Sequence, residues 1–193
     1  MEGDDIHIID SPSSPPFSTR EAYMMLSSGR PVDVSASTTW ALRLPSKPKI
    51  FAYLADIDWL STRANLFYKN CAPSTVCVAC PAIEMGRHIF FDCPLAAALW
   101  RRLKVAIPAG EFSLWDLPSP MQTTIDARCS AVAVLLWSLW KAQNDRVFSN
   151  NDTPLTAVVR RACDDLSLWR WHFKEDDRAP LDSLHSYLLT CIA

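Results

Sequence analysis

Apolar side chains recur at helical spacing along most of this chain, and the pattern predicts a mostly α-helical protein. The clearest stretch is 155–173, where apolar positions follow one another at steps of four and three residues. These positions are Leu155, Val159, Ala162, Leu166, Trp169 and Phe173. The seam covers about 19 residues, which is too short for a free-standing coiled coil. We therefore expect it to pack inside a helical bundle or hairpin.

The segments on either side of this seam are also predicted to be helices. The stretch from Ala131 to Val147 is one of them. Its first part is apolar on nearly all faces of the predicted helix, which predicts burial against other helices. Thr153 and Pro154 suit the N-cap and the first position of the seam helix. Pro180 is expected to begin the last helix. The inner face of that helix would carry Leu181, Leu184, Leu188 and Ile192.

Shorter helices are predicted in the N-terminal half. Ser18 and Glu21 have the spacing of a capping box, and Gly29 is expected to end the helix that they begin. The stretch 47–60 is also predicted to be helical. Its apolar face would consist of Ile50, Phe51, Leu54 and Ile57. Between these two helices we expect a loop that is anchored by Trp40.

Composition and charge narrow the class of protein. The chain has 193 residues, of which 49% are hydrophobic, and a formal net charge of −2, which gives no overall basic footprint for nucleic acid. No apolar stretch is long enough to span a membrane. The acidic N-terminus contains no secretory leader and no recognisable transit peptide. We therefore expect an intracellular protein, cytoplasmic or nuclear, whose seven cysteines are metal ligands or core residues rather than disulfides.

Four residues in the middle of the chain have the spacing of a zinc knuckle. Cys77, Cys80, His88 and Cys93 form the pattern C-x2-C-x7-H-x4-C, and three thiolates with one imidazole can close a tetrahedral Zn²⁺ site. Arg87 lies beside them and could offset the negative charge of the thiolates. A closed four-ligand site leaves no position for a reacting water, so the predicted role of Zn²⁺ is structural. The alternative is a decayed site whose cysteines are buried apolar side chains.

Several motifs around this site occur together in one order and resemble a known family. FSTREAYMML, PSKPKIFAYLADIDWLSTRANL and the Cys/His block ending in LWRRL are similar to the zinc-binding region of reverse transcriptases from plant LINE-type (non-LTR) retrotransposons. The matching positions are Phe17, Ser18, Ala22, Tyr23, Pro45, Lys47, Lys49, Phe51, the four ligands, Pro94 and Trp100. Farther on, LLWSLWKAQNDRVFSNN resembles a stretch of the same elements, with Gln143 where the family usually has Arg.

With this resemblance the chain divides into four predicted parts. Residues 1–16 would form a flexible acidic and Ser/Pro-rich arm, and 17–107 a reverse-transcriptase-type zinc-binding domain. A linker would follow at 108–127, and a C-terminal helical region at 128–193. The predicted fold class is thus a small helical domain that contains a zinc knuckle, followed by a helical bundle or hairpin.

The carboxylate motifs of the parent enzymes are not found in the sequence. A polymerase or an endonuclease needs clustered carboxylates that hold divalent metal, and no aromatic-x-Asp-Asp signature or ribonuclease-H-like acidic set occurs. We therefore expect a stand-alone fragment without enzyme activity, re-used by its host as a protein-binding module. The alternatives are an RNA- or single-stranded-DNA-binding module inherited from the parent reverse transcriptase and a relic without function.

Two groups of residues are candidates for contact with partners. For nucleic acid they are Arg87, Phe90, Arg101, Arg102 and Lys104, because basic side chains beside a stacking aromatic bind single strands. The favoured interpretation instead places Phe90 in the core and the arginines at a solvated helix end. For protein, Leu168 and Trp171 lie off the heptad seam and would form an interface if exposed, although packing of Trp171 under the last helix is the favoured prediction.

Overall fold

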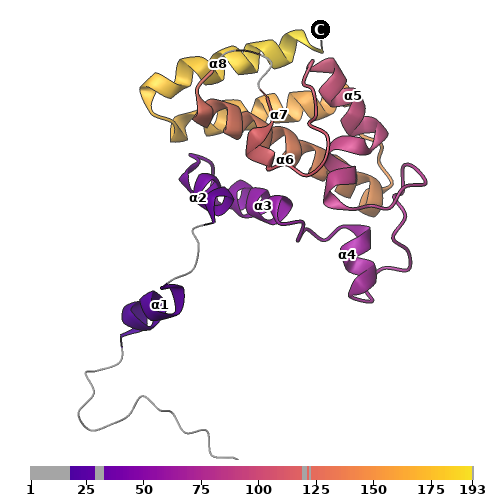
Figure 1. Ribbon diagram of the computed structural model, residues 1–193. Coiled ribbons are helices and arrows are strands. Elements are labelled where there is room, and N and C mark those ends of the chain that lie inside the picture. The colour runs from indigo at the N-terminus through magenta and orange to yellow at the C-terminus, as the bar shows by residue number, and fades with distance from the viewer. Residues whose placement is uncertain (1–17, 29–32, 119–120, 122, 193) are drawn as a thin grey trace, which may run out of the picture. The chain divides into compact units, whose positions relative to one another are not determined.

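The computed structural model describes residues 18–28, 33–118, 121 and 123–192, and over these residues the protein is mostly α-helical, as predicted (Figure 1). The chain forms two compact units, Met1–Asp33 and Val34–Ala193. In the first unit, α1 (Thr19–Ser27) begins where the capping box predicts, because the Ser18 side chain accepts a hydrogen bond from the Glu21 backbone N–H at 3.3 Å. The predicted arm at 1–16 and Gly29 lie outside the described residues.

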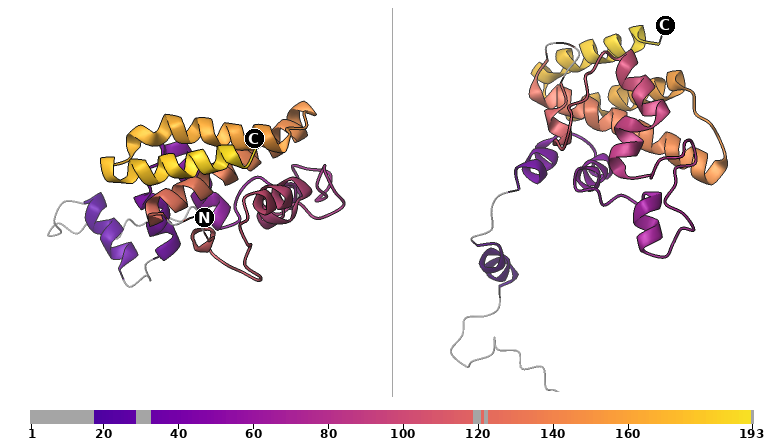
Figure 2. Two further views of the ribbon diagram at one scale, coloured as in Figure 1. Left: turned by 90° about the horizontal axis from the view of Figure 1, so that it is seen from above. Right: turned by 45° about the vertical axis from the view of Figure 1, so that its right-hand side comes forward.

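The core of the second unit is built on three long helices. These are α6 (Ile125–Ser149), α7 (Leu155–Trp169) and α8 (Glu175–Thr190), and each contacts the other two (Figures 1 and 2). The first half of α6 is buried nearly all round, as its apolar composition predicts. The heptad seam is confirmed as well. Its buried members are Val159, Ala162, Leu166, Trp169 and Phe173.

The starts of α7 and α8 differ from the prediction. Pro154 is the N-cap of α7, so the helix begins one residue later than the sequence indicates. The Thr153 hydroxyl instead donates to the Asp145 carboxylate at 3.4 Å. α8 begins at Glu175 and continues through Pro180, which was expected to be its first residue. Its predicted inner face is nonetheless buried at Leu181, Leu184 and Leu188.

The predicted loop around Trp40 is wrong, because this stretch contains a helix. α2 (Val34–Ala41) packs on α3 (Ser46–Asp56), with Thr39 completely buried and the Ser35 hydroxyl bonded to the Asp56 carboxylate. A Ser/Thr-rich sequence has weak helix propensity, and here packing outweighs it. The Trp40 side chain is 50% exposed and is not the anchor of the segment.

On α3 the predicted apolar face is correct only in part. Phe51 is buried and Leu54 packs against the core, whereas Ile50 and Ile57 are exposed. Small side chains occupy the rest of the buried face, which consists of Pro48, Phe51, Ala52 and Ala55. Alanines allow the helix to approach α6 closely, where the Phe51 ring meets the Trp137 ring edge-on at 5.0 Å between centroids.

The remaining elements are short. They are α4 (Arg63–Tyr68), the π-helix His88–Asp92, α5 (Pro94–Arg102) and the 3₁₀ helices Leu114–Asp116 and Arg170–His172. The candidate metal ligands lie between α4 and the start of α5. Thr62 caps α4 through its hydroxyl, which accepts a hydrogen bond from the Asn65 N–H at 3.2 Å. α5 begins at Pro94, a residue that suits the first turn of a helix. None of the helices in the described part of the chain has the length and apolar character needed to cross a membrane.

Side chains from both sides of the predicted linker at 108–127 belong to one hydrophobic core. Within the linker itself, Leu114, Trp115 and Leu117 are buried. A capping box at Ser113 and Asp116 starts the 3₁₀ helix that directs these residues inward. The division into a zinc-binding domain at 17–107 and a helical region at 128–193 remains a prediction, and the two parts share this core over the described residues.

Candidate metal centre

The structure brings the four predicted ligands together. One ligand atom each from Cys77, Cys80, His88 and Cys93 lies within 4.8 Å of the others, and the Cys80 Sγ and His88 Nε2 atoms are 3.3 Å apart. With Zn–S bonds of about 2.3 Å, the edge of a tetrahedral site is about 3.8 Å. The arrangement therefore needs only a small contraction to reach zinc geometry. Cys77, His88 and Cys93 are buried, and Cys80 is half-buried.

Local backbone structure explains how ligands from separate segments converge. An antiparallel bridge pairs Val76 with Ile83, and the Cys77 N–H donates to the Ala82 carbonyl at 2.8 Å. These contacts fold the Cys77–Cys80 turn back on itself. His88 begins the π-helix, and the N–H of Cys93 donates to the His88 carbonyl at 2.7 Å. Cys93 is also the N-cap of α5, which fixes the direction of its side chain.

The electrostatics of the cluster favour a cation. Burial, together with the neighbouring Cys77, raises the pKa of the Cys93 thiol to about 12. Burial likewise raises the pKa of Cys77, with repulsion from Cys80 and Glu84 added. Metal binding requires thiolates, so a metal must displace these protons, and its affinity is expected to rise with pH. A cation that offsets the clustered negative charge would reverse the pKa shifts.

The donor set fits zinc. Three sulfurs and one imidazole nitrogen are typical of closed structural Zn²⁺ sites, and calcium or magnesium would require oxygen ligands. The fourth cysteine of this region, Cys71, is exposed and does not belong to the cluster. Cys129 and Cys163 are buried core thiols, in agreement with their positions in the helical patterns.

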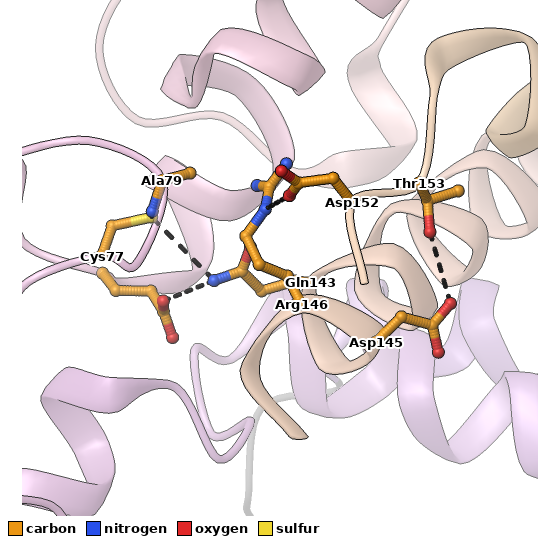
Figure 3. A network of polar contacts seen from close by, with 8 residues as sticks. Cys77, Ala79, Gln143, Asp145, Arg146, Asp152 and Thr153 are labelled. Atoms are coloured by element: carbon orange, nitrogen blue, oxygen red, sulfur yellow. Dashed lines mark hydrogen bonds and ion pairs between the residues drawn. The ribbon is translucent and has the colours of Figure 1, made fainter. Parts of the chain in front are cut away.

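A polar network next to Cys77 could not be predicted from the sequence motif. The Gln143 side chain of α6 points toward Cys77, with Nε2 3.9 Å from its Sγ atom and 2.5 Å from Oε2 of Glu84 (Figure 3). Glu84 is 3% exposed, and burial raises its pKa. Gln143 is 66 residues from Cys77. The sequence draws attention to Gln143 in one way, because the family that the chain resembles usually has Arg at this position.

The geometry defines a class of site, a Cys₃His centre of the zinc type in a helical protein. Comparison with known protein families supports this class. Residues 17–100 match the model of a family described as zinc-binding in reverse transcriptase, which confirms the resemblance that the motifs predict. The chain is also similar to an Arabidopsis thaliana protein named putative ribonuclease H protein. The two are 28% identical over 151 residues, which are 70% of this chain. The match covers 24% of that relative. No solved structure matches the chain.

The candidate nucleic-acid residues lie in different environments. Phe90 is 1% exposed and packs edge-on against Phe51, so it is not available for stacking on a base. Arg87 donates to the Gly110 carbonyl at 2.8 Å and lies 3.6 Å from the Asp92 carboxylate. Arg102 bonds the Cys191 carbonyl. The four basic candidates, Arg87, Arg101, Arg102 and Lys104, are all exposed.

The candidate protein-interface residues are both on the surface. Leu168 is 69% exposed and Trp171 is 70% exposed, so the favoured prediction that Trp171 packs under the last helix is wrong. The Trp171 indole instead lies against two guanidinium groups, those of Arg170 at 5.3 Å and Arg178 at 5.2 Å from the ring centroid. The aromatic side chains of this stretch that are buried are Trp169 and Phe173 of the seam.

Proposed function

We propose that this chain is a retrotransposon-derived protein that acts without catalysis, as a zinc-stabilised helical scaffold that binds another protein. The proposal has two parts. Zn²⁺ held by the four ligands would stabilise the segment around them, and the surface formed by Leu168 and Trp171 would contact the partner. The match to a reverse-transcriptase zinc-binding family supports the origin and the metal. The free state of all seven cysteines, each of which lies in the described part of the chain, supports an intracellular location.

The exposed Trp171 carries the proposal for protein binding. A large indole left in water is unfavourable unless a partner covers it, and Trp is among the residues that dominate binding energy at protein interfaces. Arg170 holds one side of the ring and is itself fixed by the Asp182 carboxylate through two hydrogen bonds of 2.7 Å. The ring is therefore presented in a defined orientation, and binding would lose little side-chain entropy.

The surroundings of Trp171 indicate the chemistry of the partner. The guanidinium groups of Arg170 and Arg178 flank the indole, and Leu168 lies one turn earlier on the same side. An apolar side chain on the partner would cover the ring and Leu168. A carboxylate beside it would complement the flanking cations.

The test is affinity capture with the full-length chain followed by mass spectrometry. A matched control is available, because Trp59 is 71% exposed, nearly the same as Trp171, and its neighbours are Asn65 and Lys69 of the α4 region rather than Arg170 and Arg178. We expect the wild type to capture a reproducible partner that Trp171→Ala loses and Trp59→Ala retains. No reproducible partner, or equal loss in both variants, would contradict the proposal.

A second candidate function is binding of RNA or single-stranded DNA. The observation that favours it is the exposure of Arg101 and Lys104 at the end of α5, next to the family-matched region. Each phosphate contact to a single strand contributes about 0.7 to the slope of log affinity against log salt. Replacing Arg101, Arg102 and Lys104 by Glu should abolish salt-sensitive binding of a labelled oligonucleotide. Charge reversal at the exposed Arg160 and Lys174 should have little effect, and equal affinity of all three proteins would exclude this function.

A relic without function is the third possibility from the sequence. A relic can be distinguished from a protein-binding and from a nucleic-acid-binding protein by the presence of the chain in tissue, since a relic need not accumulate as protein. Immunodetection of the chain in tissue would argue against it.

A further inference from the structure

We propose that Gln143 is a positioning residue of the metal centre, which donates a hydrogen bond to the Cys77 sulfur and joins α6 to the ligand segment. This inference rests on zinc binding at the four ligands, the first part of the proposed function, and is independent of any protein partner. It extends the centre beyond the family-matched residues 17–100, because Gln143 lies 43 positions past their end.

The geometry of the amide supports this role. Gln143 is 6% exposed, and its Nε2 atom approaches two acceptors, the Cys77 sulfur at 3.9 Å and the Glu84 carboxylate at 2.5 Å. An amide nitrogen carries two N–H groups, so both contacts can be made at once. Both partners are acceptors when the thiol is deprotonated. The orientation with nitrogen toward Cys77 is therefore the one that satisfies the site (Figure 3).

Glu84 holds the amide in this orientation. Its other carboxylate oxygen accepts the Arg63 backbone N–H at 3.0 Å at the start of α4, and its own N–H donates to the Thr75 carbonyl at 2.8 Å. The carboxylate is thus held by the Arg63 N–H, and the backbone of Glu84 is held by Thr75. A buried carboxylate also needs these donors, since an unpartnered one would be costly.

The consequence for the metal centre is electrostatic. Three thiolates leave a Zn²⁺ centre with net negative charge, and an N–H directed at a sulfur lowers that charge locally. Cys77 also receives the backbone N–H of Ala79, 3.4 Å away, as is usual within a knuckle. The second donor comes from α6, whose Arg146 and Val147 line one cavity together with Val78 and Ala79 of the ligand segment.

The test uses the full-length chain with Co²⁺ in place of Zn²⁺, because the sulfur-to-cobalt charge-transfer band reports electron donation by the thiolates. Gln143→Leu removes the donor, and Gln143→Met does so with a side chain of similar length and flexibility that should still fold. Both are expected to move the band to lower energy and to weaken Zn²⁺ affinity by about 10–100-fold, measured by competition with a chromophoric chelator. Gln143→Arg keeps N–H groups for Cys77 and Glu84 and should retain the band position.

Ser130→Ala is the matched control, because Ser130 is a fully buried polar residue near the other end of α6. It should leave the band and the affinity unchanged. A Gln143→Met protein that binds one equivalent of Co²⁺ with the wild-type spectrum would overturn the proposal. Failure of the wild type itself to bind Co²⁺ or Zn²⁺ would overturn both this inference and the proposed zinc scaffold. A failure of the Gln143 inference alone is therefore distinguished by a wild type that binds metal.

Discussion

The ligand segment between Thr62 and Cys93 leaves much of its apolar surface in water, whereas α6, α7 and α8 bury most of theirs against one another. The large apolar side chains that these helices expose are Ile125, Phe148, Leu168 and Leu189. In the ligand segment the exposed apolar side chains are Phe67, Tyr68, Val76, Val78, Ile83 and Met85. Its regular structure is one short helix, an isolated bridge and a π-helix. The three long helices instead pack along continuous apolar faces.

This difference indicates two sources of stability in one compact unit. A helix pair is stabilised by the apolar area that it removes from water, and its stability needs no ligand. A segment with few buried side chains must obtain its stability elsewhere, and a structural metal is the usual source in small modules. The four clustered ligands lie in a segment whose large buried apolar side chains are those of Ile89, Phe90 and Phe91 in the π-helix.

The largest expected effect is therefore that of metal loss on the ligand segment. A structural Zn²⁺ site contributes an apparent binding free energy of about 10–16 kcal/mol, which is lost when its thiolates are removed. Cys77→Ser/Cys80→Ser should carry no stoichiometric metal and should lose hydrogen-exchange protection at 62–93, while amides of α7 keep most of theirs. Metal analysis and exchange mass spectrometry make the two measurements.

Cys71→Ser is the control, because Cys71 is exposed and lies outside the cluster. It should bind metal and exchange like the wild type. A double variant that keeps its protection at 62–93 without metal would show that the segment does not depend on zinc, and the comparison above would fail.

The next effect in size concerns the helices. Leu166 is completely buried on the seam of α7, and truncation of such a side chain to Ala costs about 2–5 kcal/mol. Leu168→Ala, two residues farther on the exposed face, should change the free energy of unfolding by less than about 0.5 kcal/mol. Denaturant unfolding followed by circular dichroism compares the two variants. Equal destabilisation would mean that the seam does not carry the packing.

The sequence predicted the helices that have strong apolar periodicity and missed what depends on neighbours in space. The seam of α7 and the buried start of α6 follow from spacing alone. α2 was missed because its Ser and Thr residues give no periodic signal, and it is stabilised by contact with α3. The predicted start of α8 at Pro180 is wrong, because proline is more common in the first turn than inside a helix, whereas here it lies inside the helix.

The ion pairs of α7 also depend on neighbours in space that the sequence does not show. Spacing predicts an ion pair between Arg161 and Asp165 within α7. In the structure both residues pair with α6 instead, Arg161 with Asp145 at 3.0 Å and Asp165 with Lys141 at 2.8 Å. Periodicity places these side chains on one face of α7, but it does not show which charges of another helix lie opposite.

For the candidate site, the sequence supplied the ligands and not their surroundings. Cys77, Cys80, His88 and Cys93 lie close together in the chain, so their spacing alone indicates a shared centre. Gln143 reaches the same centre from α6 only after the chain has folded. A contact across 66 residues depends on tertiary packing, which a single sequence does not display.

The smallest expected effect concerns the ion pair that orients the Trp171 surface. The hydrogen bonds from Arg170 lower the pKa of Asp182 below its usual value. A carboxylate with a lowered pKa adds stability above the pKa of the unfolded chain, and this stability is lost as the pH falls through the folded pKa. Asp182→Asn should therefore be slightly less stable than the wild type at pH 7, and the difference should vanish in acid.

Zn²⁺ held at the four ligands would be released in acid from the wild type and from Asp182→Asn alike, as the thiols become protonated, so only the difference in stability between the two proteins reports Asp182. A direct measurement is the carboxyl carbon titration of Asp182 by NMR, in the wild type and in Arg170→Gln. The pKa should rise toward the ordinary Asp value in the variant, because the two donors are gone. An unchanged pKa would mean that this exposed pair is not formed in solution. Trp171 would then lack the support that distinguishes it from the other exposed aromatic side chains of the protein.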